Sequence, residues 1–432
     1  MRPVARVARC AIAAAMLLVL PTPGYTQSPV TIVPARPGVN PAEALSEPAR
    51  VRYTSRIGFL PSDPALGGNY PRVVELKAFA AARGNLLATF ARRGAMPVFR
   101  SRDRGETWEL ASELPGLRGE PTLLELPRAV GGFPAGTVLV AGSAAVDPSP
   151  DERRLQLYAS RDGGATWRFV STIAASPPGR YDPINRAGLS DQSPVWEPFL
   201  YLDARGALTA AYSDEGFKRE GYSQLIEHKI SPDGGRTWGR AVRDVAVADG
   251  LTRPGMPVVA RSADGTFFMS YEVVGKPGVA LEPRSNPAHF RTSRDGRDWG
   301  DPNGYGTFIE DRWRQYVNGT PYIVWSPWGG AKGTLLVSGR SILRYNLGRV
   351  GNGMLINRTG GEGLWTLIET PISYDPQGDG YSQTMLPLGD GREILQMVPV
   401  NGRIAFARFE LPAELPVTPF AGGFTRPKPP PR

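Results

Sequence analysis

The octapeptide Ser160-Arg161-Asp162-Gly163-Gly164-Ala165-Thr166-Trp167 decides the fold, because it recurs along the chain. Its copies begin at serines 101, 160, 231 and 293, so the intervals are 59, 71 and 62 residues, and the last copy is shortened. The aspartate can accept hydrogen bonds from backbone N–H groups across a tight turn, and glycine supplies a positive φ. The tryptophan can bury its ring between neighbouring sheets. We interpret the repeat as a β-hairpin turn and expect a degraded fifth copy, without the aspartate, at 357–365.

The spacing of the repeat predicts the architecture. About 60 residues suit a four-stranded unit, and the stretch from Val51 to Pro416 has room for six of them. The 51 glycines and 43 prolines break the chain into short apolar runs without helical periodicity. We therefore predict an all-β chain that forms a six-bladed β-propeller over residues 51–416. The last blade is expected to borrow a strand from residues 51–58, which closes the ring and removes an exposed edge.

The two ends of the chain have a different composition. Three arginines precede an apolar run, Cys10–Leu20, that is too short to cross a bilayer. This order predicts a signal peptide at 1–26, then an N-terminal extension at 27–50, and hence a secreted or periplasmic protein with no membrane span. Cys10 is the only cysteine, so the mature chain is expected to contain neither a disulfide nor a cysteine-ligated metal. Residues 417–432 form a proline-rich basic tail.

The remaining composition argues against several classes of ligand. The formal net charge is +9, but the arginines are dispersed through turns, so we expect a solvated basic surface and no nucleic-acid partner. His228 and His289 are the only histidines, and both are interpreted as structural. No acidic or histidine cluster has metal-ligand spacing, which predicts no catalytic metal and no cofactor.

Blade topology indicates where chemistry is expected. The repeated turn joins the third and fourth strands, so starts of first strands and ends of second strands should meet at the opposite face, around the central channel. The polar residues at such positions are Arg72, Glu120, Glu197, Arg253 and Tyr381, with Asp214, Glu215, Glu272 and Arg340 at second-strand ends. Two carboxylates beside a phenol and arginines suit glycoside hydrolysis. The alternative is that these groups only form ion pairs at the channel mouth.

Four motifs in order make the chain recognisable: Trp196-Glu197-Pro198-Phe199-Leu200, Ala211 to Glu215, Arg253 to Pro257, and Met269-Ser270-Tyr271-Glu272. This string resembles the exo-α-1,5-L-arabinanases of glycoside hydrolase family 93, which are sialidase-like propellers, and the repeated turn resembles their Asp-box. The resemblance implies a retaining mechanism, with Glu197 as acid/base and Glu272 as nucleophile. Tyr381 resembles the tyrosine of sialidases at the start of the final blade. Arg72 resembles their first arginine, although the usual FRIP form is absent.

These observations predict an exo-acting glycoside hydrolase that is monomeric, with a carbohydrate partner and arabinan as the first expected substrate. The expected catalytic residues are Glu197, Glu272 and Tyr381. The expected substrate-binding residues are Arg72, Glu120, Asp214, Arg253, Trp196 and Trp325, the two tryptophans as stacking platforms. Two alternatives stay open: a non-catalytic glycan-binding propeller, and an exo-sialidase. The sequence shows no set of three arginines placed to hold a sialic acid carboxylate, which argues against the sialidase.

Overall fold

Short strands and turns make up the described secondary structure, apart from three single-turn 3-10 helices. The computed structural model describes residues 56–114, 116–145, 153–176, 193–275, 285–345 and 348–415. All of these belong to one compact unit, Asn40–Arg432. The 3-10 helices are η2 (Pro64–Leu66), η3 (Ala80–Ala82) and η4 (Lys218–Glu220). The expected signal peptide, N-terminal extension and basic tail lie outside the described residues.

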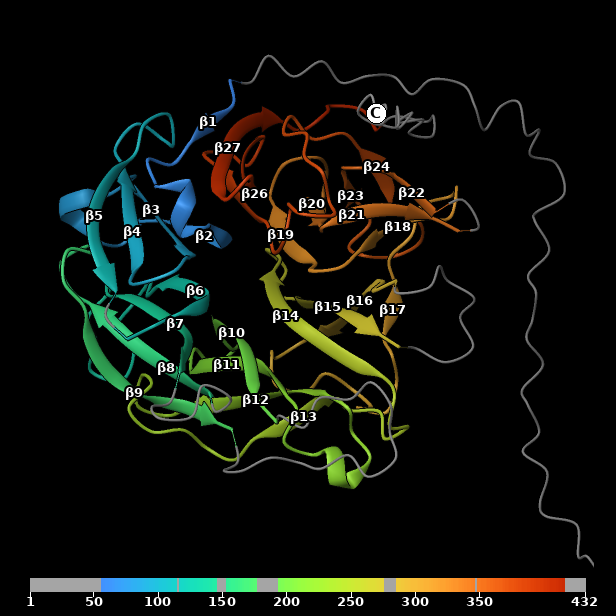
Figure 1. The fold of residues 1–432 in the computed structure, drawn as a ribbon, viewed down its shortest axis with the longest axis horizontal. Helices are drawn as coiled ribbons and strands as arrows, with labels where there is room; N and C mark the ends of the chain where they lie inside the picture. Colours follow the sequence, from blue (N-terminus) through green and yellow to red (C-terminus); the bar gives the residue numbers. More distant parts are fainter. Residues whose placement is uncertain are drawn as a thin grey trace, which may run out of the picture. The chain divides into compact units, whose positions relative to one another are not determined.

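Six four-stranded antiparallel sheets form the blades of a ring (Figure 1). In the first four blades the strands pair in chain order, and Figure 1 shows their first strands nearest the centre. The first and second blades contain β2 (Asn69–Glu75), β3 (Leu86–Ala91), β4 (Met96–Ser101) and β5 (Glu109–Leu114), then β6 (Gly119–Glu125), β7 (Val138–Ala145), β8 (Arg153–Ser160) and β9 (Arg168–Ala175). The third and fourth contain β10 (Val195–Leu202), β11 (Leu208–Asp214), β12 (Leu225–Ser231) and β13 (Val242–Val245), then β14 (Arg253–Arg261), β15 (Phe267–Val274), β16 (Ala288–Ser293) and β17 (Thr307–Phe308).

The last two blades depart from this simple order. The fifth blade is β19 (Tyr322–Ser326), β20 (Thr334–Ser338), β23 (Met354–Asn357) and β24 (Thr366–Ile368). A separate three-stranded sheet is formed by β18 (Gln315–Asn318), β21 (Ser341–Arg344) and β22 (Gly348–Gly351). The sixth blade is β25 (Thr384–Leu388), β26 (Glu393–Val400), β27 (Arg403–Glu410) and β1 (Gly58–Phe59). The strand from the N-terminal side therefore completes the last blade, as predicted, although residues 51–55 lie outside the described part.

The repeated turns have the hydrogen bonds that the sequence predicts. In the second blade, Asp162 accepts hydrogen bonds from the N–H groups of Ala165 (3.1 Å) and Thr166 (2.9 Å). The Ser160 hydroxyl accepts from Gly164 N–H at 2.8 Å, and Gly164 has φ of 87°. The degraded fifth copy is also a turn: Asn357 Oδ1 takes the place of the serine hydroxyl and accepts from Gly361 N–H at 2.8 Å.

Each tryptophan of a repeated turn packs against the preceding blade. Trp108 of the first blade lies 6.1 Å from the Phe406 ring of the sixth, measured between ring centroids. Trp167 donates to Ser112 of the first blade, and Trp238 donates to Ser171 of the second, both at 3.0 Å. The hydrophobic core is accordingly divided into clusters that lie between neighbouring blades. Burial of a large ring at these seams stabilises the ring of blades by adding apolar contact between sheets.

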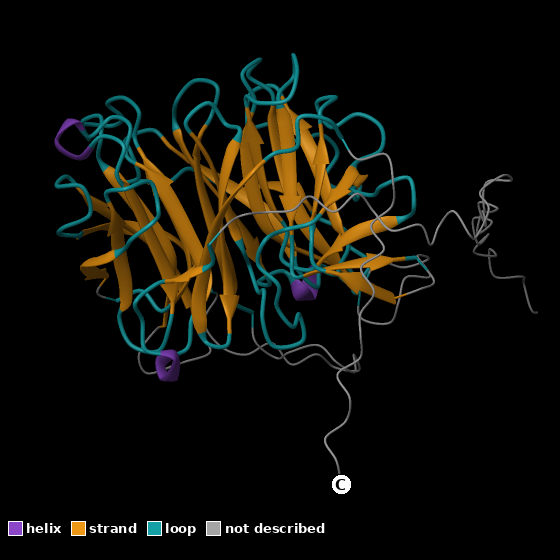
Figure 2. Ribbon diagram, turned by 90° about the horizontal axis from the view of Figure 1, so that it is seen from above, coloured by secondary structure: helices purple, strands orange, loops and turns teal. Residues whose placement is uncertain are grey.

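The two faces of the propeller carry different connections. Seen from the side, the strands run from one face to the other and loops lie at both (Figure 2). The repeated turns join third to fourth strands, so first strands begin at the opposite face. The prediction of an all-β, six-bladed propeller is confirmed. No helix among the described residues is long and apolar enough to cross a membrane.

Candidate active site

One strained residue marks the start of the first strand in every blade. These residues are Tyr70 (φ 56°), Glu120 (51°), Glu197 (60°), Met256 (59°), Thr320 (50°) and Ser382 (52°). All but Ser382 precede a proline, which itself disfavours helical conformations at the residue before it. A left-handed backbone at a residue other than glycine costs about 1–3 kcal/mol, and such strain gathers at functional sites. In the first four blades the pairing of first and second strands shifts register at this point.

Backbone hydrogen bonds link these residues from one blade to the next. The N–H of Glu197 donates to Glu120 Oε2 at 3.2 Å, and the N–H of Met256 donates to Glu197 Oε2 at 2.8 Å. Further round the ring, the N–H of Ser382 donates to Thr320 Oγ1 at 3.0 Å. The strained backbone therefore presents donors to side chains of the preceding blade, and two of those side chains are carboxyls.

The surroundings of Glu197 favour the protonated form of its carboxyl. Its Oε2 atom accepts from Met256 N–H and from the Ser213 hydroxyl, at 2.9 Å. No described residue donates to its Oε1 atom, which is the oxygen left to carry a proton. Burial, followed by the nearby charges of Glu120 and Glu272, raises the pKa of Glu197 to about 8.

Glu120 competes with Glu197 for one proton. Its carboxyl accepts from the Ser143 hydroxyl and forms an ion pair with Arg153 at 3.2 Å. Burial raises the pKa of Glu120, whereas Arg153 and the two hydrogen bonds oppose that rise. Because the arginine favours the charged form of Glu120, the proton of the pair resides on Glu197.

Glu272 has donors and cations around it. It lies on β15, opposite Gly255 of β14, and its Oε2 accepts from Thr320 N–H at 2.8 Å. The pKa of Glu272 is raised by burial, and the Thr320 hydrogen bond, the Arg253 charge, the Asn286 amide and the Arg340 charge oppose this rise. These partners favour an ionised carboxylate, which is the form a nucleophile requires.

Tyr381 lies close to Tyr70 of the first blade and near the carboxyls. Its ring centroid is 6.0 Å from that of Tyr70, and the Arg340 guanidinium carbon is 5.8 Å from its ring centroid. Burial raises the pKa of Tyr381, and Glu197 and Glu272 raise it further. The phenol is therefore neutral and available as a hydrogen-bond donor beside both glutamates.

Three other predicted residues lie near this cluster but have protein partners. The Arg72 guanidinium donates to the carbonyl and hydroxyl of Ser382, at 3.1 and 2.9 Å, and lies over the Tyr70 ring. Arg253 donates to Glu215 (2.6 Å) and Gln224 (2.8 Å). Trp196 donates to Glu215 at 3.0 Å, and the Arg153 guanidinium lies 3.8 Å from its ring centroid. Arg72 thus joins the first blade to the sixth.

The structure does not bring Asp214 and Trp325 to the glutamates. Ser213 faces Glu197, so its neighbour Asp214 projects from the other side of β11. Burial, followed by the charge of Glu227, raises the pKa of Asp214 to about 7. Trp325 lies towards the far end of β19 from Thr320, and it lines a cavity with Asp264 and Arg294 on the side of the repeated turns.

Sequence reasoning missed the groups that hold the carboxyls, namely Ser143, Arg153 and Ser213. Ser143 and Ser213 occupy the second-strand position that Glu272 occupies in the fourth blade: they pair with Gly119 and Trp196, as Glu272 pairs with Gly255. The available signal was the repeated residue-proline pair at first-strand starts. Aligning the blades on that pair would have located both serines.

Comparison with known proteins identifies the family. No protein-family model and no curated protein sequence matches the chain. Among solved structures, an α-L-arabinanase from Penicillium chrysogenum complexed with arabinobiose is 32% identical, with a TM-score of 0.67 over 79% of this chain and 93% of that one. The family 93 α-L-arabinofuranosidase of Fusarium graminearum is 29% identical, with a TM-score of 0.67 over 82% and 96% of the two chains. The chain belongs to glycoside hydrolase family 93. A Hadza microbial sialidase at 17% identity and a TM-score of 0.53 shares the fold.

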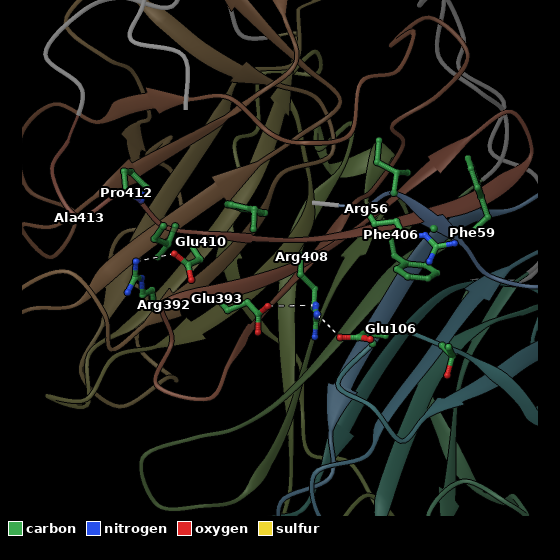
Figure 3. Close-up of a pocket in the computed structure, with 16 residues that line it drawn as sticks. Arg56, Phe59, Glu106, Arg392, Glu393, Phe406, Arg408, Glu410, Pro412 and Ala413 are labelled. Atoms are coloured by element: carbon green, nitrogen blue, oxygen red, sulfur yellow. Dashed lines mark hydrogen bonds and ion pairs between the residues drawn. The ribbon is translucent and has the colours of Figure 1, made fainter. Parts of the chain in front are cut away.

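In this family 93 chain, a cavity of about 890 Å3 lies apart from the carboxyl cluster, at the seam of the first and sixth blades (Figure 3). Arg408 there bridges Glu106 (2.7 Å) and Glu393 (3.4 Å). Figure 3 shows Arg392 beside Glu410, at 2.8 Å. Of these pairs, Arg408–Glu106 crosses the seam and joins the sixth blade to the first, whereas Arg392 and Glu410 both belong to the sixth. Among the described residues, no group of histidine, cysteine and acidic side chains has the arrangement of a metal site.

Proposed function

We propose that this family 93 chain is an exported, exo-acting glycoside hydrolase that cleaves arabinan by a retaining mechanism. The observation that carries the proposal is the different surroundings of two half-buried glutamates of adjacent blades. Glu197 is favoured in its protonated form, and its proton-carrying oxygen is free. Glu272 is surrounded by groups that favour its ionised form. A protonated acid and a charged carboxylate form the pair that retaining glycosidases use.

The proposed first step forms a bond between Glu272 and the anomeric carbon of the sugar. As this bond forms, the bond from that carbon to the leaving oxygen breaks, and Glu197 Oε1 gives its proton to that oxygen. In the second step Glu197, now ionised, takes a proton from water, and the hydroxide oxygen attacks the anomeric carbon. The bond to Glu272 breaks, and both carboxyls return to their starting states.

The neighbouring residues have supporting roles in this scheme. Arg253 and Arg340 favour the charge of Glu272 before and after each turnover. The neutral phenol of Tyr381 is proposed to donate a hydrogen bond to the Glu272 carboxylate, whose negative charge decreases as it bonds to the sugar and returns when that bond breaks. Glu120 raises the pKa of Glu197 and thereby keeps the acid protonated at neutral pH. The basic segment and apolar run at the N-terminus support export, and we propose that the enzyme acts as a monomer outside the cytoplasm.

A screen of released sugars tests the proposed substrate. The purified chain would be incubated with arabinan, galactan and sialyllactose, and the products separated by anion-exchange chromatography. We expect arabinose or short arabino-oligosaccharides from arabinan and no product from the other two. A matched Glu197→Gln variant should release about 10²–10⁴-fold less, because glutamine keeps the shape but cannot transfer a proton. Release of sialic acid without arabinose would show that the substrate is wrong.

A further inference from the structure

A cavity distinct from the two described above adjoins the carboxyl cluster. It has a volume of about 680 Å3 and shares Tyr70, Glu120, Arg153 and Tyr381 with the candidate active site. Its other walls are the 64–69 segment and residues 91–94 and 118–119. A sugar that occupied this cavity would therefore lie next to one bound at the glutamates.

Four arginines and one glutamate contribute the charges of this cavity: Arg92, Arg93, Arg118, Arg153 and Glu120. Arg92 pairs with Glu113 at 2.5 Å, and Arg153 pairs with Glu120. Within the described part of the chain, neither Arg93 nor Arg118 has a carboxylate partner. The Arg118 guanidinium donates one hydrogen bond within the described part of the chain, to the Leu117 carbonyl at 3.2 Å, and the Arg93 guanidinium donates to the Ala65 carbonyl. Most of the N–H donors of these two guanidinium groups are therefore left for a ligand.

The backbone between Arg118 and Glu120 leaves room for that ligand. Gly119 occupies the position that Trp196 and Tyr381 occupy in their blades, immediately before the left-handed residue. A Cβ atom added at Gly119 would meet no atom within 4 Å. The partly exposed ring of Tyr381 provides a surface against which a sugar ring can pack, and the buried ring of Tyr70 lies 6.0 Å from it, measured between ring centroids. The cavity thus combines open space, aromatic surface and unpaired positive charge.

We propose that this cavity is a subsite for the carboxylate of a uronic acid, held by Arg118 and Arg93. A guanidinium group presents paired N–H donors that match the two oxygens of a carboxylate. No neutral group of a plant glycan matches these donors equally well. The proposal rests on the function proposed above, and it narrows the substrate to arabinose-containing glycans that also carry acidic sugars. Neutral arabinan remains a substrate, but it leaves these arginines solvated.

Ligand binding to the full chain tests the subsite without relying on turnover. The probes are D-galacturonate, D-galactose as its neutral match, and N-acetylneuraminate, with dissociation constants measured by NMR titration at low salt. We expect galacturonate to bind about tenfold more tightly than galactose, the ratio expected for one good charge-assisted contact. Arg118→Gln should remove most of that preference. Arg240→Gln, which removes an exposed arginine before β13, should keep it.

Three outcomes would overturn the proposal. Equal affinity for galacturonate and galactose, or a preference that survives in Arg118→Gln, would show that the cavity does not recognise a carboxylate. Binding of N-acetylneuraminate but not galacturonate would show that the uronate assignment is wrong. Because binding is measured directly, these results are independent of whether the chain hydrolyses arabinan. A catalytically inactive chain that still prefers galacturonate would contradict the proposed function and leave the subsite standing.

Discussion

Glu197 shows how the environment of one residue sets the pH range of the proposed reaction. The reaction requires Glu197 protonated, so activity should fall as pH rises through its pKa of about 8. It also requires Glu272 ionised, so activity should fall on the acid side, below a pKa that burial raises above its usual value. A bell-shaped dependence of kcat/KM on pH is therefore expected. Because the carboxyls interact, the apparent pKa values of its two limbs belong to the set of carboxyls and not to single residues.

Removing the charge of Glu120 should move the alkaline limb to lower pH. Glu120→Gln takes away the second-largest cause of the raised pKa of Glu197, so the acid loses its proton sooner as pH rises. The measurement is the pH profile of kcat/KM on an aryl arabinoside, with Glu109→Gln as a control at an exposed ion pair. An unchanged alkaline limb in Glu120→Gln would contradict the assignment of Glu197 as the acid.

Ser213→Ala should move the same limb in the opposite direction. The Ser213 hydroxyl donates to Glu197 and favours its ionised form, so its loss raises the pKa of the acid further. Met256 N–H continues to hold the carboxyl, and the fold should be retained. A purely structural serine would lower kcat without moving the limb, and that result would remove Ser213 from the account.

At the scale of the element, the repeated turn and the left-handed residue at the start of each first strand have different roles. Asp162 accepts two backbone N–H bonds at one end of its blade, and no predicted catalytic residue lies in its turn. The left-handed residues lie at the opposite ends of first strands, and two of them, Glu120 and Glu197, carry carboxyls. Stability and chemistry are therefore expected to respond to different substitutions.

Asp162→Ala should destabilise the protein without slowing turnover. Loss of its backbone hydrogen bonds is expected to cost about 1–2 kcal/mol of unfolding free energy, as for other aspartates that cap turns. Urea unfolding measures the loss, and kcat of the folded fraction should match the wild type. Glu109→Ala, which removes only an exposed ion pair, should cost less. A large fall in kcat in fully folded Asp162→Ala would mean that the two faces are assigned the wrong way round.

The elements also show why some features were readable from sequence and others were not. Asp162 and Trp167 recur at fixed spacing, so blade number followed from the turns alone. Glu197 and Glu272 were found because strand direction places them at one face. The surroundings of Arg72 and Trp325 could not be predicted in this way. The sequence does not show that Ser382 already accepts hydrogen bonds from Arg72, or that Trp325 lies at the far end of its strand. The separate sheet of β18, β21 and β22 was not predicted, because none of its strands carries the repeated turn.

At the scale of the whole molecule, the ring depends on closure between the first and sixth blades. The two residues of β1 pair with β27, Gly58 opposite Phe406, and Trp108 packs against that phenylalanine. Arg72 joins the same two blades on the other face through Ser382. Closure removes the exposed sheet edge, so the blades should unfold together.

Gly58→Ala should weaken closure. A Cβ atom at this position would lie 2.3 Å from the Phe406 ring, so either β1 or the ring must shift. We expect a loss of about 1–3 kcal/mol in unfolding free energy, measured by urea titration. Gly378→Ala is the matched control, because a Cβ there meets no atom within 4 Å. If both variants were equally stable, closure by β1 would contribute nothing measurable.

The central claim is that Glu197 and Glu272 act on one glycosidic bond as acid/base and nucleophile. Azide rescue of Glu197→Ala and Glu272→Ala, with the configuration of the glycosyl azide determined by NMR, tests it most directly. With an aryl arabinoside whose leaving group needs no acid, Glu197→Ala should still form the glycosyl-enzyme, and azide should then give a product that retains the configuration of the substrate. In Glu272→Ala azide should replace the nucleophile and give the inverted product. Inverted azide from Glu197→Ala, or no rescue of either variant, would contradict the account.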